Sequence, residues 1–474
     1  MQNKISRKDA IKSILAGVGV GIATPILLTK FYNLNYKKKE NKTLQFKSIH
    51  RSIGNPRIKE PITAITIGAG ARGNTYGNYA LNFPNELKII GVAEPIDIRK
   101  KRFCEKHNID KSQSFKSWEE IFNKPKFADA VIICTPDHLH YGPCIKALEM
   151  GYDILLEKPI AQTEKECREI LRLQKKNNNI LAVCHVLRYA PYFINLKHLI
   201  DSGIMGEIIS VQHIEPIEHI HMSHSYVRGN WHDSKKSTPI ILAKSCHDLD
   251  ILRWLIDKKC ESISAFGNLK WFTSKNAPKG STDRCNQGCK VEPNCPYSAL
   301  KIYYRERRRT FVFDLPENES KHGDYILRQL SKTNYGRCVY KMDNNQPDHY
   351  VVSMEFEGGV TANFSMEALT SYDGRRTRIM GSLGDVVGDM NEFIYTNFLT
   401  GEKTKWSIEN DPNTVKDFNG HGGGDLSLVT DWVLAVKTKN LKNLSSTIDA
   451  SIESHLMGFA AEDSRLNKQV VKII

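Results

Sequence analysis

One glycine-rich stretch limits what this chain can fold into more than any other feature. The string Gly68-Ala69-Gly70-Ala71-Arg72-Gly73 matches G-x-G-x-x-G, follows a β-branched run and precedes a helical pattern. In a strand, turn and helix of this kind, backbone N–H groups and the positive end of the helix dipole converge on a pyrophosphate. The stretch therefore predicts a dinucleotide site. The residues expected to line it are Gly68, Gly70, Ala71, Arg72 and Gly73.

Short β-branched runs alternate with longer amphipathic runs up to residue 184, which is typical of a parallel sheet with crossover helices. The expected strands are Thr63–Ile67, Leu87–Ala93, Ala130–Cys134, Asp153–Leu156 and Ile180–Cys184. The expected helices are Asn74–Asn82, Arg99–His107, Gly142–Met150 and Glu164–Lys176. Residues 61–184 are therefore predicted to form a doubly wound, NAD(P)-binding Rossmann domain.

After residue 185 the expected strands become longer and the helices fewer. Glu207–Glu215, Tyr350–Phe356 and Thr361–Met366 are the clearest strands. This rhythm favours a large, mostly antiparallel open sheet. The predicted fold class is α/β, with the Rossmann domain followed by an α+β substrate-binding domain over residues 185–474.

The basic charge of the chain is concentrated near its N-terminus. Residues 1–60 hold 13 Lys and Arg against 3 acidic residues, so only about +4 of the net charge of +14 remains for the rest. The cluster of Arg305, Arg307, Arg308 and Arg309 is interpreted as a solvated face. We therefore expect no nucleic-acid partner.

Residues 1–32 have the layout of a signal or membrane anchor. A charged start precedes the apolar stretch Ile14–Leu28. The segment Ser6–Lys12 is similar to a twin-arginine export signal, although Lys8 replaces the second arginine and Ala10 the phenylalanine. The apolar stretch is shorter than the ~20 residues of a bilayer-spanning helix, and no clear cleavage site follows it. We expect a membrane tether facing the periplasm, then a linker over 33–60; a cytoplasmic enzyme is the alternative.

Glu94 follows the second expected strand, where a carboxylate can accept hydrogen bonds from an adenine-ribose diol. A negative charge there repels a 2′-phosphate, so NAD is favoured over NADP. Arg99 lies nearby and could offset the repulsion or stack on adenine. Both residues are expected to contact the cofactor.

Two further motifs follow later strands of the first domain. With the glycine-rich loop and Glu94, Thr135-Pro136-Asp137-His138-Leu139-His140 and Glu157-Lys158-Pro159 resemble the signatures of the glucose-fructose oxidoreductase, inositol dehydrogenase and MocA family. The resemblance covers about residues 61–474. It implies an open α/β second domain whose sheet face often forms dimers, and hence a homo-oligomer. The further cofactor contacts expected are Thr135, Pro136, His140, Glu157, Lys158 and, after the last strand, Arg188.

Lys158 is the expected catalytic base. Removal of a hydride from an alcohol requires that the hydroxyl proton leave as well, and a lysine beside a cationic nicotinamide can accept it. The matching lysine of the family does this and also binds cofactor. Lys158-Pro159 is an X-Pro bond that can be cis.

A second group of candidate catalytic residues lies around residues 243–248. The family's D-x-x-x-H pair is matched by His247, but Ala243 stands where the aspartate is expected. Two arrangements stay open: Lys244 and Lys158 flank the substrate, or His247 acts with another carboxylate such as Asp248. Lys244 and His247 are expected at the substrate in either case.

Other polar segments are expected to line the cleft. The segment from His219 to Trp231 holds three histidines within six residues, a spacing that fits a loop as well as a zinc site. His224 and Trp231 are expected to contact substrate, as is His421 before a glycine run. No metal site is predicted.

The chain has eleven cysteines, three of them close together: Cys285, Cys289 and Cys295. Their spacing does not match a common zinc pattern, and a fourth ligand would have to come from a distant part of the chain. A disulfide within this loop, or no bond at all, is expected ahead of a metal.

The leading functional hypothesis is an NAD(P)-dependent oxidoreductase that moves a hydride to or from a hydroxyl or carbonyl of a sugar, glycoside or polyol. If the protein is exported, a reaction that consumes NAD is disfavoured, because no cofactor pool outside the cytoplasm converts NADH back to NAD. The alternative is a glycoside hydrolase or epimerase of the same superfamily that retains its NAD and causes no net redox change.

Overall fold

The computed structural model describes residues 43–48, 53–55, 58–411 and 421–473. All of them except Thr43 belong to one compact unit, Leu44–Ile474. The expected signal or anchor over 1–32 and much of the expected linker lie outside the described residues. Within the described ranges, no helix has the length and apolar character needed to cross a membrane.

A six-stranded sheet in the order β4-β3-β2-β5-β6-β7 forms the first half, and all its pairings are parallel. Its strands are β2 (Ile62–Ile67), β3 (Leu87–Ala93), β4 (Ser114–Phe115), β5 (Ala130–Ile133), β6 (Asp153–Leu156) and β7 (Leu181–Val183). The accompanying helices are α3 (Ala71–Asn82), α4 (Asp97–His107), α5 (Trp118–Phe122), α6 (Tyr141–Glu149) and α7 (Glu164–Asn177). The doubly wound prediction is confirmed, because its five strands each lie within one residue of an observed strand.

The second half is built on a ten-stranded sheet in the order β1-β15-β14-β13-β12-β8-β11-β10-β9-β16. Its strands are β1 (Thr43–Gln45), β8 (Ile208–Pro216), β9 (Cys260–Asn268), β10 (His349–Phe356), β11 (Val360–Glu367), β12 (Arg376–Gly381), β13 (Gly384–Gly388), β14 (Glu392–Asn397), β15 (Lys403–Ser407) and β16 (Val471–Lys472). β8 and β11 pair in parallel, whereas β10 pairs antiparallel with both β9 and β11. The predicted large, mostly antiparallel sheet is confirmed.

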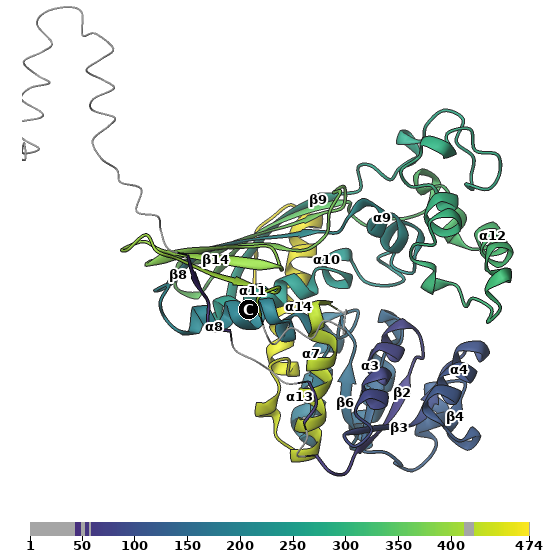
Figure 1. The fold of residues 1–474 in the computed structure, drawn as a ribbon, viewed down its shortest axis with the longest axis horizontal. Helices are drawn as coiled ribbons and strands as arrows, with labels where there is room; N and C mark the ends of the chain where they lie inside the picture. The colour runs from purple at the N-terminus through teal and green to yellow at the C-terminus, as the bar shows by residue number, and fades with distance from the viewer. Residues whose placement is uncertain (1–42, 49–52, 56–57, 412–420, 474) are drawn as a thin grey trace, which may run out of the picture. The chain divides into compact units, whose positions relative to one another are not determined.

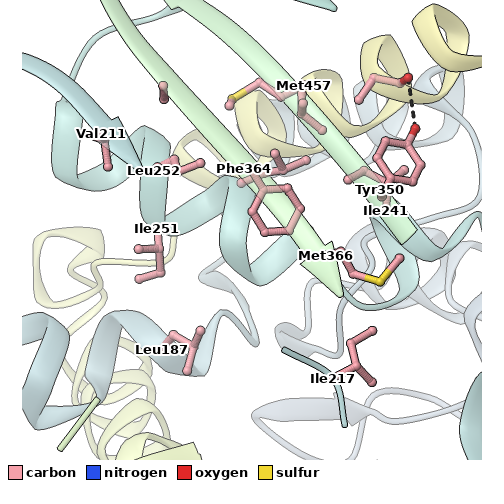
Figure 2. Packing of buried hydrophobic residues seen from close by; sticks show 14 of the residues in the cluster. Leu187, Val211, Ile217, Ile241, Ile251, Leu252, Tyr350, Phe364, Met366 and Met457 are labelled. Carbon is pink, nitrogen blue, oxygen red and sulfur yellow. Dashed lines mark hydrogen bonds between the residues drawn. The ribbon is translucent and has the colours of Figure 1, made fainter. Parts of the chain in front are cut away.

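Side chains of the ten-stranded sheet alternate between a buried and an exposed face, as β10 shows most regularly. Helices α8 (Pro191–Asp201), α11 (Cys246–Ile256) and α14 (Ile448–Asn467) cover the buried face (Figure 1). Figure 2 shows part of this core, with Leu252 of α11 and Met457 of α14 against Phe364 of β11. In the described part of the chain, no helix covers the opposite face, on which alternate residues of β10 are exposed.

Helix α13 (Gly424–Thr438) comes from the C-terminal part of the chain but packs into the core of the first domain. Trp432 of this helix is fully buried, and its indole N–H donates to the carbonyl of Ile154 in β6 at 3.1 Å. The core of the first domain, which the sequence predicts over 61–184, therefore also includes α13.

An insert of about eighty residues joins β9 to β10. It contains helix α12 (His322–Lys332) and the π-helical segment η8 (Leu300–Arg305), packed around Tyr303, Phe313 and Leu330. The insert also contacts α4 of the first domain: Arg99 pairs with Asp314 at 2.7 Å, and Arg102 donates to the Leu315 carbonyl at 2.6 Å. It lies beside the dinucleotide-binding half, in the upper right of Figure 1.

Candidate active site

The three glycines of the β2–α3 turn are each required for a different reason. Gly68 has a φ of +93°, and a Cβ there would lie 2.6 Å from the Cys134 carbonyl oxygen. A Cβ on Gly73 would lie 2.0 Å from the Gly68 carbonyl oxygen. By contrast, a Cβ on Gly70 would meet no protein atom within 4 Å. Gly68 and Gly73 shape the turn, and Gly70 presents bare backbone to open space.

Helix α3 begins at this open space with unsatisfied donors. No side chain caps it at Gly70, and its first turn holds no acidic residue. The backbone N–H groups of Ala71 and Arg72 therefore face a position that suits an anion. These features fit the pyrophosphate of a dinucleotide.

Glu94 lies at the carboxyl end of β3 and is 4% exposed. Its carboxylate accepts hydrogen bonds from the N–H of Ala69 at 2.8 Å and of Ile96 at 3.0 Å. The charge thus lies directly against the glycine-rich turn, where a ribose diol is expected. Arg99, expected nearby, is paired with Asp314 of the insert.

Glu157 is buried behind the turn and holds several side chains together. It accepts from Arg72 Nε at 2.5 Å and from the Tyr76 hydroxyl at 2.7 Å. Arg72 also pairs with Asp425 of α13 at 2.6 Å. Burial acts to raise the pKa of Glu157, but the charges of Arg72 and Lys158 outweigh it and lower that pKa. The ion pair between Arg72 and Glu157 therefore holds the start of α3 against the end of β6, next to the cofactor turn.

Lys158 follows β6 at the carboxyl edge of the parallel sheet, and its peptide bond to Pro159 is cis. Its ammonium donates to the backbone carbonyl of Ala243 in the second domain at 2.7 Å. The turn is held from behind: His140 places its two ring nitrogens 2.6 Å from the Pro159 carbonyl and 2.8 Å from that of Thr135. His140 thus joins the two sequence motifs, in place of the expected cofactor contact.

The rings of three histidines, His185, His247 and His421, lie in a row beside Lys158. The ring of His247 lies 5.7 Å from that of His421 and 5.9 Å from that of His185. His421 is itself 3.1 Å from Asp425. Burial and the charge of Lys158 hold the pKa of His247 well below its usual value, so this imidazole is neutral. The Nδ1 atom of His247 is buried and has no hydrogen-bond partner among the described residues.

Lys244 and Asp248 belong to a buried network of alternating charges. Lys244 pairs with Glu215 at 2.9 Å, and Arg375 bridges Glu215 at 2.7 Å to Asp248 at 2.6 Å. Asp248 also contacts His213 at 3.0 Å. The suggestion that Asp248 serves as the carboxylate partner of His247 is thus wrong, because both of its oxygens are used by this network.

Replacing Asp248 with asparagine is expected to destabilise the protein by about 3–5 kcal/mol at neutral pH, because Arg375 would lose a buried partner. Burial acts to raise the pKa of Asp248, but Arg375 and His213 lower it from 3.8 to about 2. The carboxylate therefore stabilises the fold fully above about pH 4, and this contribution is lost as the pH falls toward 2. Urea unfolding of both proteins at several pH values should show their difference shrinking below pH 4.

A suitable control is Asp97→Asn, on an exposed side chain, which should cost less than about 1 kcal/mol. A difference between wild type and Asp248→Asn that stayed constant from pH 6 to pH 3 would contradict the assigned charge pairing.

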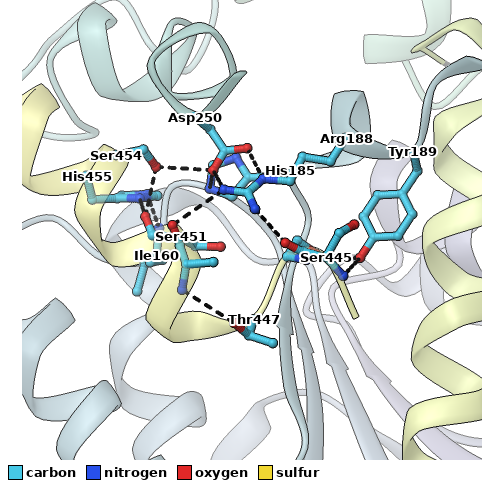
Figure 3. A network of polar contacts seen from close by, with 12 residues as sticks. Ile160, His185, Arg188, Tyr189, Asp250, Ser445, Thr447, Ser451, Ser454 and His455 are labelled. Atoms are coloured by element: carbon cyan, nitrogen blue, oxygen red, sulfur yellow. Dashed lines mark hydrogen bonds and ion pairs between the residues drawn. The ribbon is translucent and has the colours of Figure 1, made fainter. Parts of the chain in front are cut away.

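Arg188, expected at the cofactor, has a structural role instead (Figure 3). Two of its nitrogens bind the Asp250 carboxylate, each at 2.7 Å, and a third donates to the Ser445 carbonyl at 2.5 Å. The same network includes His455, whose Nε2 accepts from the backbone N–H of Ile160 at 3.0 Å. It therefore supports the turn that carries Lys158. Asp250 and His455 were not predicted from the sequence, since nothing in their spacing marks them.

Of the expected substrate residues on 219–231, His224 lies away from Lys158. It is buried among the aromatic side chains of the insert, with Nδ1 2.7 Å from the Tyr303 hydroxyl and its ring stacked on Tyr335. Burial lowers its pKa to about 3. His221 is the histidine of this segment near the lysines: burial and the charges of Lys244 and Lys158 lower its pKa. The structure thus places His221, rather than the predicted His224, near Lys158.

Trp231 connects the two domains. Its indole N–H lies 3.1 Å from each carboxylate oxygen of Asp137, in the first signature motif. Thr238 also donates to Asp137 at 2.8 Å. Trp231, expected at the substrate, thus fixes the position of the second domain above the carboxyl edge of the parallel sheet.

Two family models match the chain. Residues 62–185 match the oxidoreductase family, NAD-binding Rossmann fold, and residues 197–473 match the C-terminal alpha/beta domain of the same family. A Bacillus subtilis protein named oxidoreductase YteT is 26% identical over 370 residues, covering 74% of this chain and 83% of that one. The scyllo-inositol 2-dehydrogenase (NAD(+)) of Bacillus subtilis is 26% identical over 224 residues, or 45% of this chain and 59% of the relative. This chain thus spans less than two thirds of that dehydrogenase.

Solved structures show the same fold. An inositol dehydrogenase homolog from Azotobacter vinelandii, complexed with NADH and myo-inositol, superimposes with a TM-score of 0.62 at 15% identity, covering 89% of this chain and all of the other. The scyllo-inositol dehydrogenase of Lactobacillus casei gives 0.60 at 15% identity, covering 87% of this chain and 99% of the other. With both domains matched, the chain belongs to the glucose-fructose oxidoreductase, inositol dehydrogenase and MocA family of NAD-binding oxidoreductases.

Proposed function

We propose that this protein oxidises a secondary hydroxyl of a polyol or sugar and that Lys158 accepts the hydroxyl proton. The observation that carries the proposal is the position of the Lys158 side-chain nitrogen. It bonds to Ala243 across the domain boundary, next to the neutral His247 and at the same sheet edge as the Gly70 turn. A proton acceptor and an anion-binding turn at one edge suit hydride transfer.

The chain's own groups have separate tasks in this reaction. NAD, when bound, supplies the hydride acceptor. As the neutral amine, Lys158 Nζ takes the proton from the substrate hydroxyl, while an N–H of the same amine keeps the bond to the Ala243 carbonyl. The neutral imidazole of His247 offers a hydrogen-bonding partner to a neighbouring hydroxyl. Lys244 stays paired with Glu215 and so acts as a fixed positive charge beside the substrate.

The chemistry of the cleft supports a polyhydroxylated substrate. His221, His247, His421 and the two lysines supply several hydrogen-bonding groups in a small space. The relatives named inositol dehydrogenase favour net oxidation over the alternative in which NAD is retained and regenerated. Because Ala243 replaces the acid of the family pair, we assign the base to Lys158 alone.

The direct test is to incubate the full-length chain with NAD and a panel of inositols, monosaccharides and glycosides, and to follow the formation of NADH. We expect NADH to accumulate in proportion to the oxidised product. Product formation without NADH, together with one NAD released per chain on denaturation, would instead establish the retained-cofactor alternative and refute net oxidation.

We further propose that the N-terminal segment directs the enzyme to the periplasmic side of a membrane and that the chain forms a homo-oligomer. The charged and apolar pattern of residues 1–32 supports the first proposal. The open sheet face supports the second, since Phe266 and Val351 are exposed there on paired strands, 61% and 47% respectively. Recovery of the protein in the cytoplasmic fraction would contradict the proposed localisation. A monomeric mass by light scattering would contradict the proposed homo-oligomer.

A further inference from the structure

The insert between β9 and β10 brings four cysteines together. Cys285, Cys289, Cys295 and Cys338 all line one cavity, together with Arg228. The first three are neighbours in sequence, whereas Cys338 lies forty-three residues after Cys295. All four are free thiols. The fold thus brings Cys338, which is distant in sequence, to the other three cysteines as the fourth sulfur.

The backbone around the cavity is organised to hold these sulfurs. Arg284 and Arg337 form an antiparallel bridge, which places the following residues, Cys285 and Cys338, on the same face of the two segments. Gly288 has a φ of +70° and turns the chain just before Cys289. The insert therefore presents its cysteines from fixed backbone.

Several N–H groups are directed at the sulfurs. The backbone N–H of Ala299 donates to the Cys285 sulfur at 3.4 Å. Burial raises the pKa of the Cys295 and Cys338 thiols, and the backbone N–H groups of Tyr297 and Tyr340 partly oppose that rise. Donors around several sulfurs stabilise negative thiolates, as in the surroundings of bound metals.

Arg228 supplies an independent argument. It is 1% exposed, and the partners of its guanidinium among the described residues are two carbonyls and a sulfur rather than a carboxylate. Its guanidinium donates to the carbonyls of Arg337 and Tyr297, each at 2.8 Å, and lies 3.8 Å from the Cys285 sulfur. Its Nη1 has no hydrogen-bond partner in the described part of the chain. A buried cation without a counter-charge costs several kcal/mol in a protein interior.

Neutral thiols and disulfides both leave this charge uncompensated. Four thiolates around a divalent ion carry a net charge of −2, so they supply the buried guanidinium with the negative charge it lacks and leave a net charge of −1, which the surrounding N–H donors stabilise. Soft thiolate ligands select zinc or iron–sulfur clusters, and a closed set of four is typical of structural sites.

We propose that Cys285, Cys289, Cys295 and Cys338 bind one metal centre as four thiolates, most simply a structural Zn²⁺ ion. Binding of Zn²⁺ to four thiols releases four protons and involves no change of oxidation state. Among the described residues, no three His, Cys, Asp or Glu side chains already have the geometry of a bound ion. Binding of the ion therefore requires that the sulfurs move closer together than they are here, and the proposed centre takes the place of the disulfide, or the absence of any bond, that the sequence led us to expect.

The centre would brace both ends of the active site. Arg228 precedes Trp231, which holds Asp137 of the first domain. On its other side, the insert contacts α4 through Arg99 and Asp314. A metal at the cysteines would thus stiffen the segments that join the two domains.

The test is the metal content of the full-length chain, produced with zinc and iron in the medium and purified under reducing conditions. We expect about one zinc per chain, falling below about 0.2 in Cys338→Ser. Cys104→Ser is the matched control, since Cys104 lies on α4 outside the cluster and bonds to Ser114. It should keep its zinc.

Iron with inorganic sulfide in equal amounts, lost in the same variant, would also support the four-thiolate centre and identify it as a cluster. Metal-free wild type, or a metal content unchanged in Cys338→Ser, would overturn the proposal.

If Cys338→Ser does not fold, the wild type alone decides the question. A mercurial reagent titrated against the protein with a zinc-sensitive dye should release one zinc as four thiols react. Disulfides among the four cysteines, found by mass spectrometry of protein kept from air, would refute the site.

Discussion

Lys158→Met is expected to abolish turnover, by more than about a thousandfold, while NAD affinity changes by less than about tenfold, or ~1.4 kcal/mol. The ammonium bonds to Ala243 in the second domain, and Glu157 beside it contacts Arg72 at the cofactor turn. Methionine keeps the length of the side chain but cannot accept a proton. The measurements are the rate of NADH formation and the dissociation constant of NAD.

Lys165→Met is the matched control, since this lysine is exposed on α7. It should leave both quantities unchanged. Turnover near the wild-type value in Lys158→Met would remove the lysine from the mechanism. An unfolded variant would be recognised from its circular dichroism, and Lys158→Arg, which keeps the charge and the bond to Ala243 but holds its proton, would then be measured instead.

Gly70→Ala is expected to weaken NAD binding at least about a hundredfold, or ~2.7 kcal/mol, without destabilising the protein. Its φ of −73° is acceptable for alanine, and a Cβ would meet no protein atom within 4 Å. The methyl group would, however, occupy the space in front of the N-terminus of α3, where the pyrophosphate is expected. Calorimetric titration with NAD and thermal unfolding measure the two effects separately.

Gly73→Ala should behave in the opposite way. Its Cβ would clash with the Gly68 carbonyl, so unfolding temperature as well as binding should fall. Unchanged NAD affinity in Gly70→Ala would show that the pyrophosphate does not bind at this turn.

The sequence predicts the first domain well because local patterns determine it. Strands such as β5 are buried throughout and read as unbroken apolar runs, and the glycine turn can be recognised from six adjacent residues. The ten-stranded sheet is predictable where its two faces alternate, as in β10. These elements need no knowledge of distant partners.

The insert and much of the site depend on contacts that local patterns do not contain. Arg188 could not be separated from a ligand-binding arginine without Asp250, sixty-two residues later. His221 and His224 could not be told apart, because a π-helical segment, η5 (Ser223–Arg228), begins between them and changes which way the side chains face. The sequence alone could not show that Cys338 lies near the other three cysteines, because this depends on the backbone pairing between Arg284 and Arg337.

The position of α13 has a consequence for synthesis of the chain. Strands β2 to β7 are made first, yet the buried surface they share with Trp432 stays uncovered until the last tenth of the sequence is being added. The nucleotide-binding half should therefore remain incompletely packed on the ribosome and reach its native state only with the rest of the protein. A fragment ending at residue 184 should therefore expose the apolar surface that α13 covers in the whole protein. We expect this surface to need protection by chaperones until α13 has been synthesised.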